Sequence, residues 1–354
     1  MYKVHITPQW NISNKAGLTL NMSALLDLLS SIHETGSIAQ AAQAVGLSYR
    51  YAWGLLREGE HVFNDALMLK TRGQGTKLTP LAEKLIWAER RVAARLSPTL
   101  ESLSSELETE LNTNLPEQVR AIRLHASHGF AVATLLNIFN KEQFQVETQY
   151  RNSTDAVAAL SRKECDLAGF HVPLGEFEAA ATRQYLHWLN PKTHCLIHLA
   201  IRNQGLFVAS GNPKGVRGME DLTLNRIIFV NRQKGSGTRM LLELMLAKHQ
   251  IAATDINGYE TTELTHSAVA AFIASGMAEV GFGVQTAAQR FGLDFIPLVR
   301  ERYFFALPLT ALNDPMMQHV ITVLQSSDYR EEVNKLAGYD ATDTGKILSI
   351  NEAF

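Results

Sequence analysis

Two segments of the sequence resemble each other and predict the fold of the second half of the chain. Residues 156–172 read AVAALSRKECDLAGFHV, and residues 268–284 read AVAAFIASGMAEVGFGV. They align without gaps, and each has the pattern of a small-residue helix followed by an apolar strand that ends at Gly-Phe. We interpret the repeat as two lobes of similar build with a cleft between them, an arrangement that suits ligand capture by closure. Chance similarity between two generic helix–strand units is the alternative.

The repeat lies where apolar strands alternate with helices, a pattern typical of an α/β domain. The strand candidates are AIRLHAS, VETQYR, CDLAGFHV, LFVAS, RIIFVN and AEVGFGV. A polar segment that contains a proline, NTNLPEQ at 112–118, precedes this region. We therefore expect a two-lobed ligand-binding domain over residues 116–354.

Upstream of this boundary the pattern is mainly helical. After a small hairpin within residues 1–20, the sequence predicts three helices and then two short strands around a turn in LMLKTRGQGTKLTP. A long helical segment opens at Pro80, with leucines at helical spacing, and Pro98 is expected to kink or break it. These elements predict a first domain over residues 1–80 and a linker or dimerisation helix over residues 81–115.

Bulk composition limits the class of protein. The 354 residues are too many for one average domain, and 46% apolar with 19% charged residues is ordinary for a globular chain. The net charge of −2 means that any nucleic-acid contact must come from a local basic patch. Two cysteines form no disulfide framework, and the sequence has neither a secretory signal nor an apolar run long enough to span a membrane. We expect a cytoplasmic protein with no membrane association.

The helical first domain has the order of a helix-turn-helix. The turn VGLS, residues 45–48, needs a positive φ that Gly46 provides, and Ser48 is a good cap for the next helix. The first turn of that helix would then direct Tyr49 and Arg50 toward the DNA major groove. Residues 49–95 contain nine Lys or Arg against five Asp or Glu, a local basic patch of the kind that binds phosphate. A purely structural cap is the alternative role for Ser48.

This region resembles the winged-helix domain of ModE-type molybdate-responsive regulators, which is related to that of LysR-type regulators. The resemblance covers roughly residues 20–110 and rests on LLSSIHETGSIAQAAQAVGLSYRYAWGLL followed by TRGQGTKLTPLAEKLI. It implies a winged helix-turn-helix that binds double-stranded DNA, and dimerisation through the long helix after Pro80. The residues that it implies for DNA binding are Ser48, Tyr49 and Arg50 in the recognition helix and Lys70, Arg72 and Lys77 around the wing.

The motif NRQKGSGTR, residues 231–239, has the composition of an anion-binding turn before a helix. Oxyanions are held by backbone N–H groups at helix N-termini, by hydroxyls and by arginines, and glycines let the backbone approach. The candidate ligand-binding residues here are Arg232, Gly235, Ser236, Gly237, Thr238 and Arg239. A simple N-cap formed by Ser236 or Thr238 is the alternative.

Three further strand-to-helix corners have hydroxyl side chains: HASHGF, RNSTDAVAAL and ELTHSAVAAF. We expect the four helix N-termini to converge on one cleft and to share an anion or small ligand. The additional candidates are Ser127, His128, Ser153, Thr154, Thr265 and Ser267. His171 either lines the cleft or is a structural histidine. We predict no metal site.

The second half of the chain resembles the periplasmic-binding-protein-like domain that is fused to molybdopterin biosynthesis enzymes and to helix-turn-helix regulators. NRQKGSGTR and the AVAAL…CDLAGFH block support the resemblance, over about residues 120–320. It implies a type II two-lobed fold and a molybdate, a tungstate or a molybdenum-cofactor species as effector, with no covalent cofactor. A ModE regulator would instead have a small β-barrel molybdate domain here, so the ligand does not follow from the first domain.

Catalytic signatures do not appear in the sequence. It contains no Walker A loop, no G-x-S-x-G elbow and no H-E-x-x-H motif, and GSGTRM lacks the third glycine of a dinucleotide-binding loop. We therefore predict a non-enzymatic, ligand-responsive transcriptional regulator, a homodimer or homotetramer, that binds operator DNA and senses molybdate or tungstate. The alternatives are a sensor of a small organic anion such as formate, a molybdenum-cofactor carrier and an enzyme with its active site in the cleft.

Overall fold

The computed structural model describes residues 2–70, 75–113 and 120–354. The chain forms two compact units, one of residues Thr7–Ala93 and one that combines Met1–Ile6 with Ala94–Phe354. The first division therefore lies inside a long helix, at Ala93 and Ala94. The boundary predicted between residues 115 and 116 lies outside the described residues. Within the described residues, no helix combines the length and the apolar character that crossing a membrane requires.

The smaller unit consists of helices and two small hairpins that share one apolar core. Strands β1 and β2 pair antiparallel, which confirms the predicted N-terminal hairpin. Gly46 has a φ of 71°, and the Ser48 hydroxyl accepts a hydrogen bond from the Tyr51 N–H at 3.2 Å, so both predicted roles in the turn are confirmed. The elements are β1 (Asn11–Ser13), β2 (Thr19–Asn21), α1 (Ser23–Thr35), α2 (Ile38–Ala44), α3 (Tyr49–Phe63), β3 (Met68–Lys70) and β4 (Thr76–Leu78).

The larger unit is built on one mixed sheet. Its strands follow the order β10-β9-β11-β8-β12-β7-β5-β6, and β13 and β14 pair with β8 outside this path. Two βαβαβ units form the two ends of the sheet. The first comprises β5 (Ile122–Ala126), α5 (Phe130–Lys141), β6 (Val146–Tyr150), α6 (Ser153–Ser161) and β7 (Leu167–Pro173). The second comprises β9 (Phe229–Arg232), α8 (Gly237–Lys248), β10 (Thr262–Glu263), α9 (His266–Ala274) and β11 (Val280–Val284).

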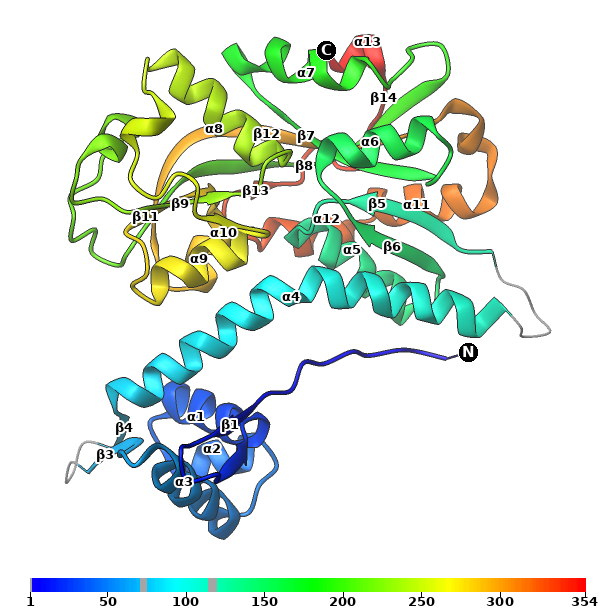
Figure 1. The fold of residues 1–354 in the computed structure, drawn as a ribbon. Helices are drawn as coiled ribbons and strands as arrows, with labels where there is room; N and C mark the ends of the chain where they lie inside the picture. Colours follow the sequence, from blue (N-terminus) through cyan, green and yellow to red (C-terminus); the bar gives the residue numbers. More distant parts are fainter. Residues whose placement is uncertain (1, 71–74, 114–119) are drawn as a thin grey trace. The chain divides into compact units, whose positions relative to one another are not determined.

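These two βαβαβ units, here the first and the second lobe, have the same topology. In each lobe the first strand lies between the third and the second and pairs parallel with both. The sequence repeat at 156–172 and 268–284 falls on the equivalent pairs α6–β7 and α9–β11. Figure 1 shows β5, β6 and α6 on one side of the larger unit and β9, β11 and α9 on the other. The repeat is therefore structural.

Two long strands join the lobes. Strands β8 (His194–Val208) and β12 (Asp294–Pro308) pair antiparallel along their whole length. The start of β8 and the end of β12 lie in the first lobe, where β12 pairs with β7; the end of β8 pairs with β11 in the second lobe. The sequence prediction recognised only LFVAS of β8 and missed β12, because several polar residues interrupt the apolar sequence at the centre of each strand.

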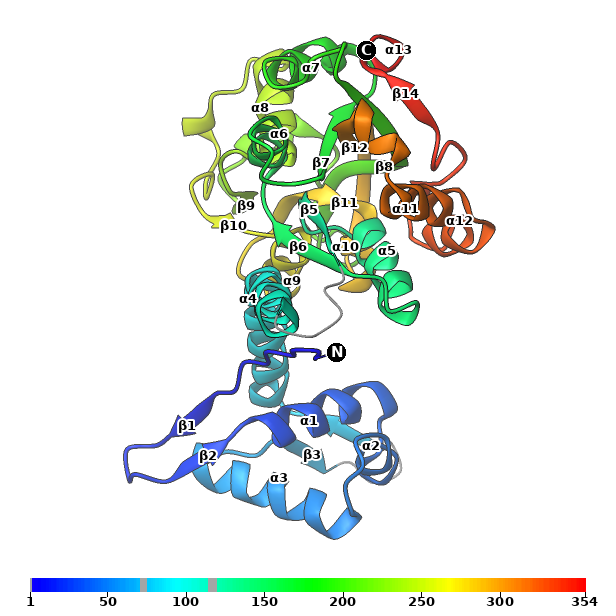
Figure 2. The ribbon, with the colours of Figure 1, turned by 90° about the vertical axis from the view of Figure 1, so that its right-hand side faces the viewer.

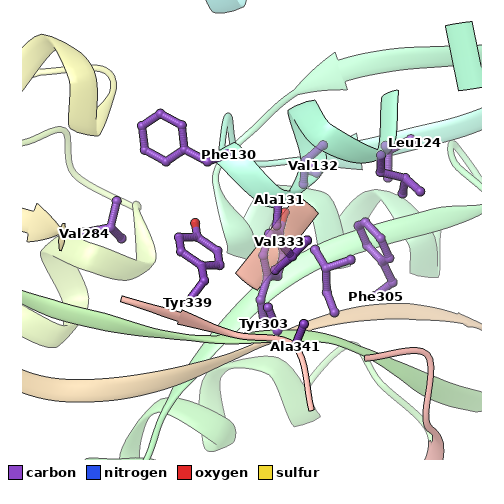
Figure 3. Close-up of a cluster of buried hydrophobic side chains, with 14 of the residues drawn as sticks. Leu124, Phe130, Ala131, Val132, Val284, Tyr303, Phe305, Val333, Tyr339 and Ala341 are labelled. Carbon is purple, nitrogen blue, oxygen red and sulfur yellow. The ribbon is translucent and has the colours of Figure 1, made fainter. Parts of the chain in front are cut away.

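Helices cover both faces of the sheet. The core on one face includes residues of α5, α9, α10 (Gln285–Arg290), α11 (Pro315–Gln325) and α12 (Ser327–Asn334). Figure 3 shows part of this core, with Tyr303, Phe305 and Tyr339 among side chains from α5 and α12. Figure 2 shows α11 beside α12, and the buried Tyr329 hydroxyl of α12 donates to the Ala131 carbonyl of α5 at 3.0 Å.

The opposite face has a separate core in each lobe. In the first lobe it is formed with α6, α7 (Glu178–Leu186) and α13 (Ile350–Ala353), and in the second with α8. The remaining strands, β13 (Tyr339–Asp340) and β14 (Ile347–Ser349), add to β8. The short 3-10 helices are η1 (Gly175–Phe177), η2 (Met219–Thr223), η3 (Ala253–Asp255) and η4 (Leu309–Asn313).

Helix α4 (Pro80–Thr113) is continuous through Pro98, so the predicted break does not occur. A proline inside a helix leaves the carbonyl four residues earlier without its helical N–H partner. Here that carbonyl, of Ala94, accepts a hydrogen bond from the Thr265 hydroxyl at 3.1 Å. A neighbouring element therefore satisfies the group that the proline leaves unpaired.

Candidate functional site: a cavity at four helix N-termini

A cavity of the larger unit has a volume of about 350 Å³ and lies at the carboxyl ends of β5, β6, β9 and β10. This is the edge at which open α/β sheets bind ligands, because the loops and helix N-termini that follow the strands meet there. Its lining residues are Pro98, Thr99, Ser102, Leu103, Ser127, His128, Tyr150, Arg151, Asn152, Ser153, His171, Arg202, Arg232, Gln233, Ser236, Gly237, Thr238, Leu264, Thr265 and His266.

Four helix N-termini contribute to the cavity wall, two from each lobe. Three of them have a side-chain cap: Asn152 accepts from the Asp155 N–H, Ser236 from Arg239 and Thr265 from Ala268. Helix α5 begins after Gly129 with no side-chain cap. The N-terminus of α5 therefore presents backbone donors that no capping side chain takes up, and all four helix dipoles favour negative charge at this end.

Gly235 and Gly237 bring the second lobe against the first. Gly235 has a φ of 83°, in the left-handed region that favours glycine. A Cβ on Gly235 would lie 3.1 Å from the Asn152 amide nitrogen, and one on Gly237 would lie 3.3 Å from the Ser153 hydroxyl. The two glycines thus allow the turn before α8 to approach α6 closely. This lobe contact is a role that the sequence did not predict; the predicted approach to a ligand stays a prediction, and Gly237 lines the cavity.

Arg232, the last residue of β9, puts an unpaired charge at the cavity. Its side chain is buried, and its Nη2 donates to the Leu264 carbonyl at 2.8 Å, but Nε and Nη1 have no hydrogen-bond partner. Burial, and then the nearby Arg202, lower the pKa of Arg232 to about 9. A buried, unpaired guanidinium is energetically costly, and an anion in the cavity would offset that cost.

Arg202 is equally buried but already has a counter-charge. Its Nε donates to Glu301 Oε1 at 2.5 Å, and Gln204 Nε2 donates to the same oxygen at 2.8 Å. Burial alone would lower the pKa of Arg202, but the attraction of Glu301 outweighs it and raises the pKa above its usual value. Arg202, Gln204 and Glu301 lie where β8 and β12 pass from one lobe to the other. Arg202 is therefore held in place as part of the lobe connection.

Two of the cavity histidines are buried and neutral. Burial, followed by Arg202 and Arg232, lowers the pKa of His171 well below its usual value; burial, Arg232 and Arg202 do the same for His266. The Ser153 hydroxyl lies 3.3 Å from His171 Nδ1, while His171 Nε2 and His266 Nδ1 have no partner. Among the described residues that line the cavity there is no Asp or Glu. Arginines, neutral imidazoles, hydroxyls and helix N-termini together make a site that suits an anion.

The structure brings most of the predicted ligand-binding residues together. The residues found in the cavity wall are Ser127, His128, Ser153, His171, Arg232, Ser236, Gly237, Thr238 and Thr265. Thr154, Gly235, Arg239 and Ser267 are outside it. Arg239 is buried within the second lobe. Its Nε donates to Glu243 at 2.7 Å, and its guanidinium lies over the Tyr259 ring at 4.1 Å. Arg239 thus has a structural partner, and its charge is not directed at the cavity.

The sequence prediction missed several lining residues. Arg202 is the most informative of them, because an arginine inside the apolar run HLAIRNQGLFV indicates a buried charge with a purpose. Arg151 and His266 lie in the predicted strand-to-helix corners RNSTDAVAAL and ELTHSAVAAF, but the prediction named only hydroxyl residues there. The α4 residues were missed because the long helix was interpreted as a linker. These residues are Pro98, Thr99, Ser102 and Leu103.

In the smaller unit, the predicted DNA-binding residues lie on or near α3 and the β3–β4 hairpin. Tyr49 and Arg50, in the first turn of α3, are exposed, and Tyr49 makes an edge-on contact with the half-buried Trp53 ring. Lys77 is an exposed residue of β4, and Lys70 is the last residue of β3. Arg72 lies outside the described residues.

The larger unit thus has a two-lobed fold with a cavity between lobes of equal topology. Comparison with protein families agrees, because residues 136–325 match the model of the PBP superfamily domain. This match covers more than half of the chain, and the chain belongs to this family.

Curated relatives cover parts of the chain. "Uncharacterized protein YvgK" of Bacillus subtilis is 32% identical over 203 residues, which are 56% of this chain and 64% of that protein. "Molybdenum-pterin-binding protein MopB" of Rhodobacter capsulatus is 36% identical over 28% of this chain and 37% of its own length. "Molybdenum transport protein ModE" of Herbaspirillum seropedicae is 43% identical over 18% of this chain and 25% of its own length. The chain spans less than two thirds of each of these relatives.

Among solved structures, a Corynebacterium glutamicum OxyR mutant matches 89% of this chain and 94% of its own, at 15% identity and a TM-score of 0.44. A likeness this weak contributes nothing to the assignment of function.

Proposed function

We propose that the protein is a ligand-responsive transcriptional regulator that binds an anion in the cavity of the larger unit and DNA through the smaller one. The buried guanidinium of Arg232, unpartnered at two nitrogens within a cavity of four helix N-termini, is the main support for anion sensing. The described residues of the cavity wall offer donors and positive charge for an anion. Binding of an anion is therefore the function that this chemistry favours.

Molybdate or tungstate is the effector that we propose first. A tetrahedral oxyanion accepts many hydrogen bonds, and helix N-termini, hydroxyls and an arginine supply them. Two of the relatives, the Rhodobacter capsulatus and Herbaspirillum seropedicae proteins, have names that refer to molybdenum-pterin binding and molybdenum transport, and they support a molybdenum-related ligand. The genes under control would then serve molybdoenzymes or the molybdenum cofactor.

An anion with an organic part, such as a molybdenum-cofactor species or a small carboxylate, is the second candidate. The cavity volume of about 350 Å³ is some tenfold larger than the roughly 30 Å³ that one water occupies in the liquid, which leaves room beside a bare oxyanion. Pro98, Leu103 and Leu264 add apolar surface to the wall, and such surface suits an organic group. Formate would fill the cavity even less than molybdate does.

The smaller unit supports the DNA-binding part of the proposal. Helices α1 to α3 with the β3–β4 hairpin have the element order of a winged helix-turn-helix, in which α3 would enter the major groove. Tyr49 and Arg50 would then contact the DNA directly, and Lys70, Arg72 and Lys77 would contact phosphates from the wing. A homodimer or homotetramer would present two such helices to an operator.

Helix α4 offers a surface for dimerisation. Leu96, near its middle, and Leu107 and Leu111, toward its end, are each 40% or more exposed. Exposed leucines at helical spacing are typical of a helix that packs on a partner. Ligand-induced closure of the lobes would shift the population of dimer geometries and thereby the spacing of the two recognition helices.

The sensing part is tested with purified full-length protein and molybdate, tungstate, formate and sulfate, each titrated calorimetrically. We expect molybdate or tungstate to bind and to change the affinity for duplex DNA from the promoter region of the protein's own gene. If neither anion binds, the effector assignment fails. If one binds and the duplex affinity is unchanged, the regulator assignment fails.

The DNA-binding part is tested by Arg50→Ala. We expect weaker binding to duplex DNA, and a slope of log affinity against log salt that is reduced by about 1 if Arg50 contacts a phosphate. Lys192→Ala removes the same charge from an exposed site of the larger unit and is the matched control. Equal effects of the two substitutions would contradict a role of α3 in DNA binding.

A further inference from the structure

The part of α4 from Ala94 onward is fixed to both lobes, whereas the sequence predicts a linker or dimerisation helix. It contacts the second lobe at Ala94 and Arg95. It contacts the first lobe at Ser102 and Ser105, about one and about two turns beyond Pro98. Residues 95 to 105 of an α-helix span about 15 Å. The cavity lies beside the stretch between these two attachments, because Pro98, Thr99, Ser102 and Leu103 line it.

The attachment to the second lobe consists of a charged pair and a hydroxyl. Arg95 Nε donates to Glu263 of β10 at 2.9 and 2.7 Å, and the Glu263 side chain is only 1% exposed. The Thr265 hydroxyl caps α9 by accepting from Ala268 at 2.9 Å and donates to the Ala94 carbonyl that Pro98 leaves free. One cavity-lining residue thereby joins the N-terminus of α9 to α4.

The attachment to the first lobe consists of serine hydroxyls on a sheet edge. Strand β6 is the last strand of the sheet, so its outer N–H groups have no strand partner. Ser105 Oγ accepts from the Thr148 N–H at 2.8 Å, and Ser102 Oγ accepts from the Tyr150 N–H at 3.0 Å. Helix α4 thus covers this edge and is held to it by directional hydrogen bonds.

The chain connections to the smaller unit adjoin the same helix. Residues Pro80–Ala93 of α4 belong to the smaller unit, and Ala94 begins the larger one. The other connection between the units lies between Ile6 and Thr7. The segment before it is also bound to α4: the Val4 N–H donates to Glu108 at 2.9 Å, and the Tyr2 N–H donates to Asn112 at 2.8 Å. Any displacement of α4 relative to the lobes therefore acts on both connections.

We propose that α4 is the element that senses the separation of the two lobes: a strut attached to both, whose position changes when an anion draws the lobes together. It would pass this change to Pro80–Ala93, the part of the same helix that belongs to the smaller unit, as a helix displacement. The inference rests on the proposed function for its ligand, but the strut itself is a property of the unliganded chain. Coupling between two sites requires an element with two arrangements, and both sites must shift the equilibrium between them.

Hydrogen–deuterium exchange on the full chain tests the strut without any ligand. Glu263→Gln weakens the attachment to the second lobe, and Ser105→Ala removes the one at Thr148; neither residue lines the cavity. If α4 links the lobes, Glu263→Gln should speed exchange of the Thr148 and Tyr150 amides, and Ser105→Ala that of residues 265–268. We expect changes of about fivefold or more, the lower end of typical coupling between sites.

Two matched substitutions serve as controls. Glu332→Gln makes the same chemical change at the exposed ion pair with Lys335, and Ser161→Ala removes a hydroxyl at the far end of α6. Neither should alter exchange at Thr148 or at residues 265–268. If Glu263→Gln and Ser105→Ala each affect only their own lobe, α4 is a passive cover and the proposal is wrong.

Tungstate and molybdate provide the second arm of the experiment. With saturating anion, the wild type should show slower exchange over α4 residues 95–105, and each attachment variant should lose most of that protection. Anion binding, by calorimetry, without any change in α4 would overturn the strut and leave the proposed function standing. Failure of both anions to bind would refute the proposed effector, while the unliganded arm would still decide the strut.

Discussion

The two lobes have the same topology but bring different chemistry to the cavity. Each supplies two helix N-termini from the equivalent corners of a βαβαβ unit. The second lobe also supplies Arg232, a buried charge without a counter-ion, whereas the arginine of the first lobe, Arg151, is exposed and pairs with the Gln149 amide oxygen. The shared topology thus supplies hydrogen-bond donors from both lobes. The positive charge that makes the site prefer an anion comes mainly from the second lobe. The second lobe should therefore contribute more than the first to the affinity of the site for an anion.

Arg202 belongs to β8, a strand shared by both lobes, and its charge is paired with Glu301. Arg202→Gln should lower the free energy of unfolding by about 3–5 kcal/mol, because it leaves Glu301 buried without its counter-charge. Chemical denaturation measures this loss. Glu301→Gln together with Arg202→Gln should recover much of it, and a double variant as unstable as the single one would contradict this explanation.

Arg232→Gln should have the opposite effects: little loss of stability and a large loss of anion affinity. It removes an unpaired buried charge, so the stability of the unliganded protein should stay the same or increase. Anion affinity should fall by about 10- to 100-fold, corresponding to the roughly 1.5–3 kcal/mol of a hydrogen bond to a charged group. Calorimetric titration with molybdate or tungstate measures the loss. Arg151→Gln, the same change in the first lobe, should have a clearly smaller effect; equal effects would refute the asymmetry between lobes.

Acid should destabilise the cavity through its histidines. Burial and the arginines lower the pKa of His171 and His266 below the unfolded value near 6.5. As pH falls below about 6.5, the unfolded chain binds protons that the folded chain does not, so stability decreases by up to about 1.4 kcal/mol per pH unit for each histidine. Denaturation between pH 5 and 7 should show a shallower slope in His171→Gln and His266→Gln. An unchanged slope would contradict the neutral state of these rings.

The smallest effects concern the helix caps. Ser236→Ala should cost about 1 kcal/mol of stability, because Ser236 caps α8, and should weaken anion binding only modestly. Ser127→Ala removes a hydroxyl before α5, which has no side-chain cap, so it should cost no helix cap; any stability loss of about 1 kcal/mol would come from the buried Tyr303 hydroxyl beside Ser127, and anion affinity should fall. Thermal denaturation and titration of both variants compare the lobes. A larger stability loss in Ser127→Ala would contradict the assignment of the two hydroxyls.

The sequence predicted the corners of the cavity better than its centre. A hydroxyl at the start of a helix is a local signal, so the four converging N-termini were recognisable, as was the two-lobed fold from the repeat. The partners of an arginine are set by tertiary structure, and for this reason Arg239 was predicted at the cavity but pairs with Glu243, while Arg202 was missed. The α4 wall depends on contacts about 50 to 170 residues apart in sequence, which spacing does not reveal.

The most direct test of anion sensing at Arg232 is thermal denaturation of the wild type and Arg232→Gln with molybdate, tungstate, formate and sulfate. A ligand that binds only the folded state raises its unfolding temperature. We predict that molybdate or tungstate stabilises the wild type and has little effect on Arg232→Gln. Equal stabilisation of both proteins, or no stabilisation of the wild type by any of these anions, would contradict the central claim.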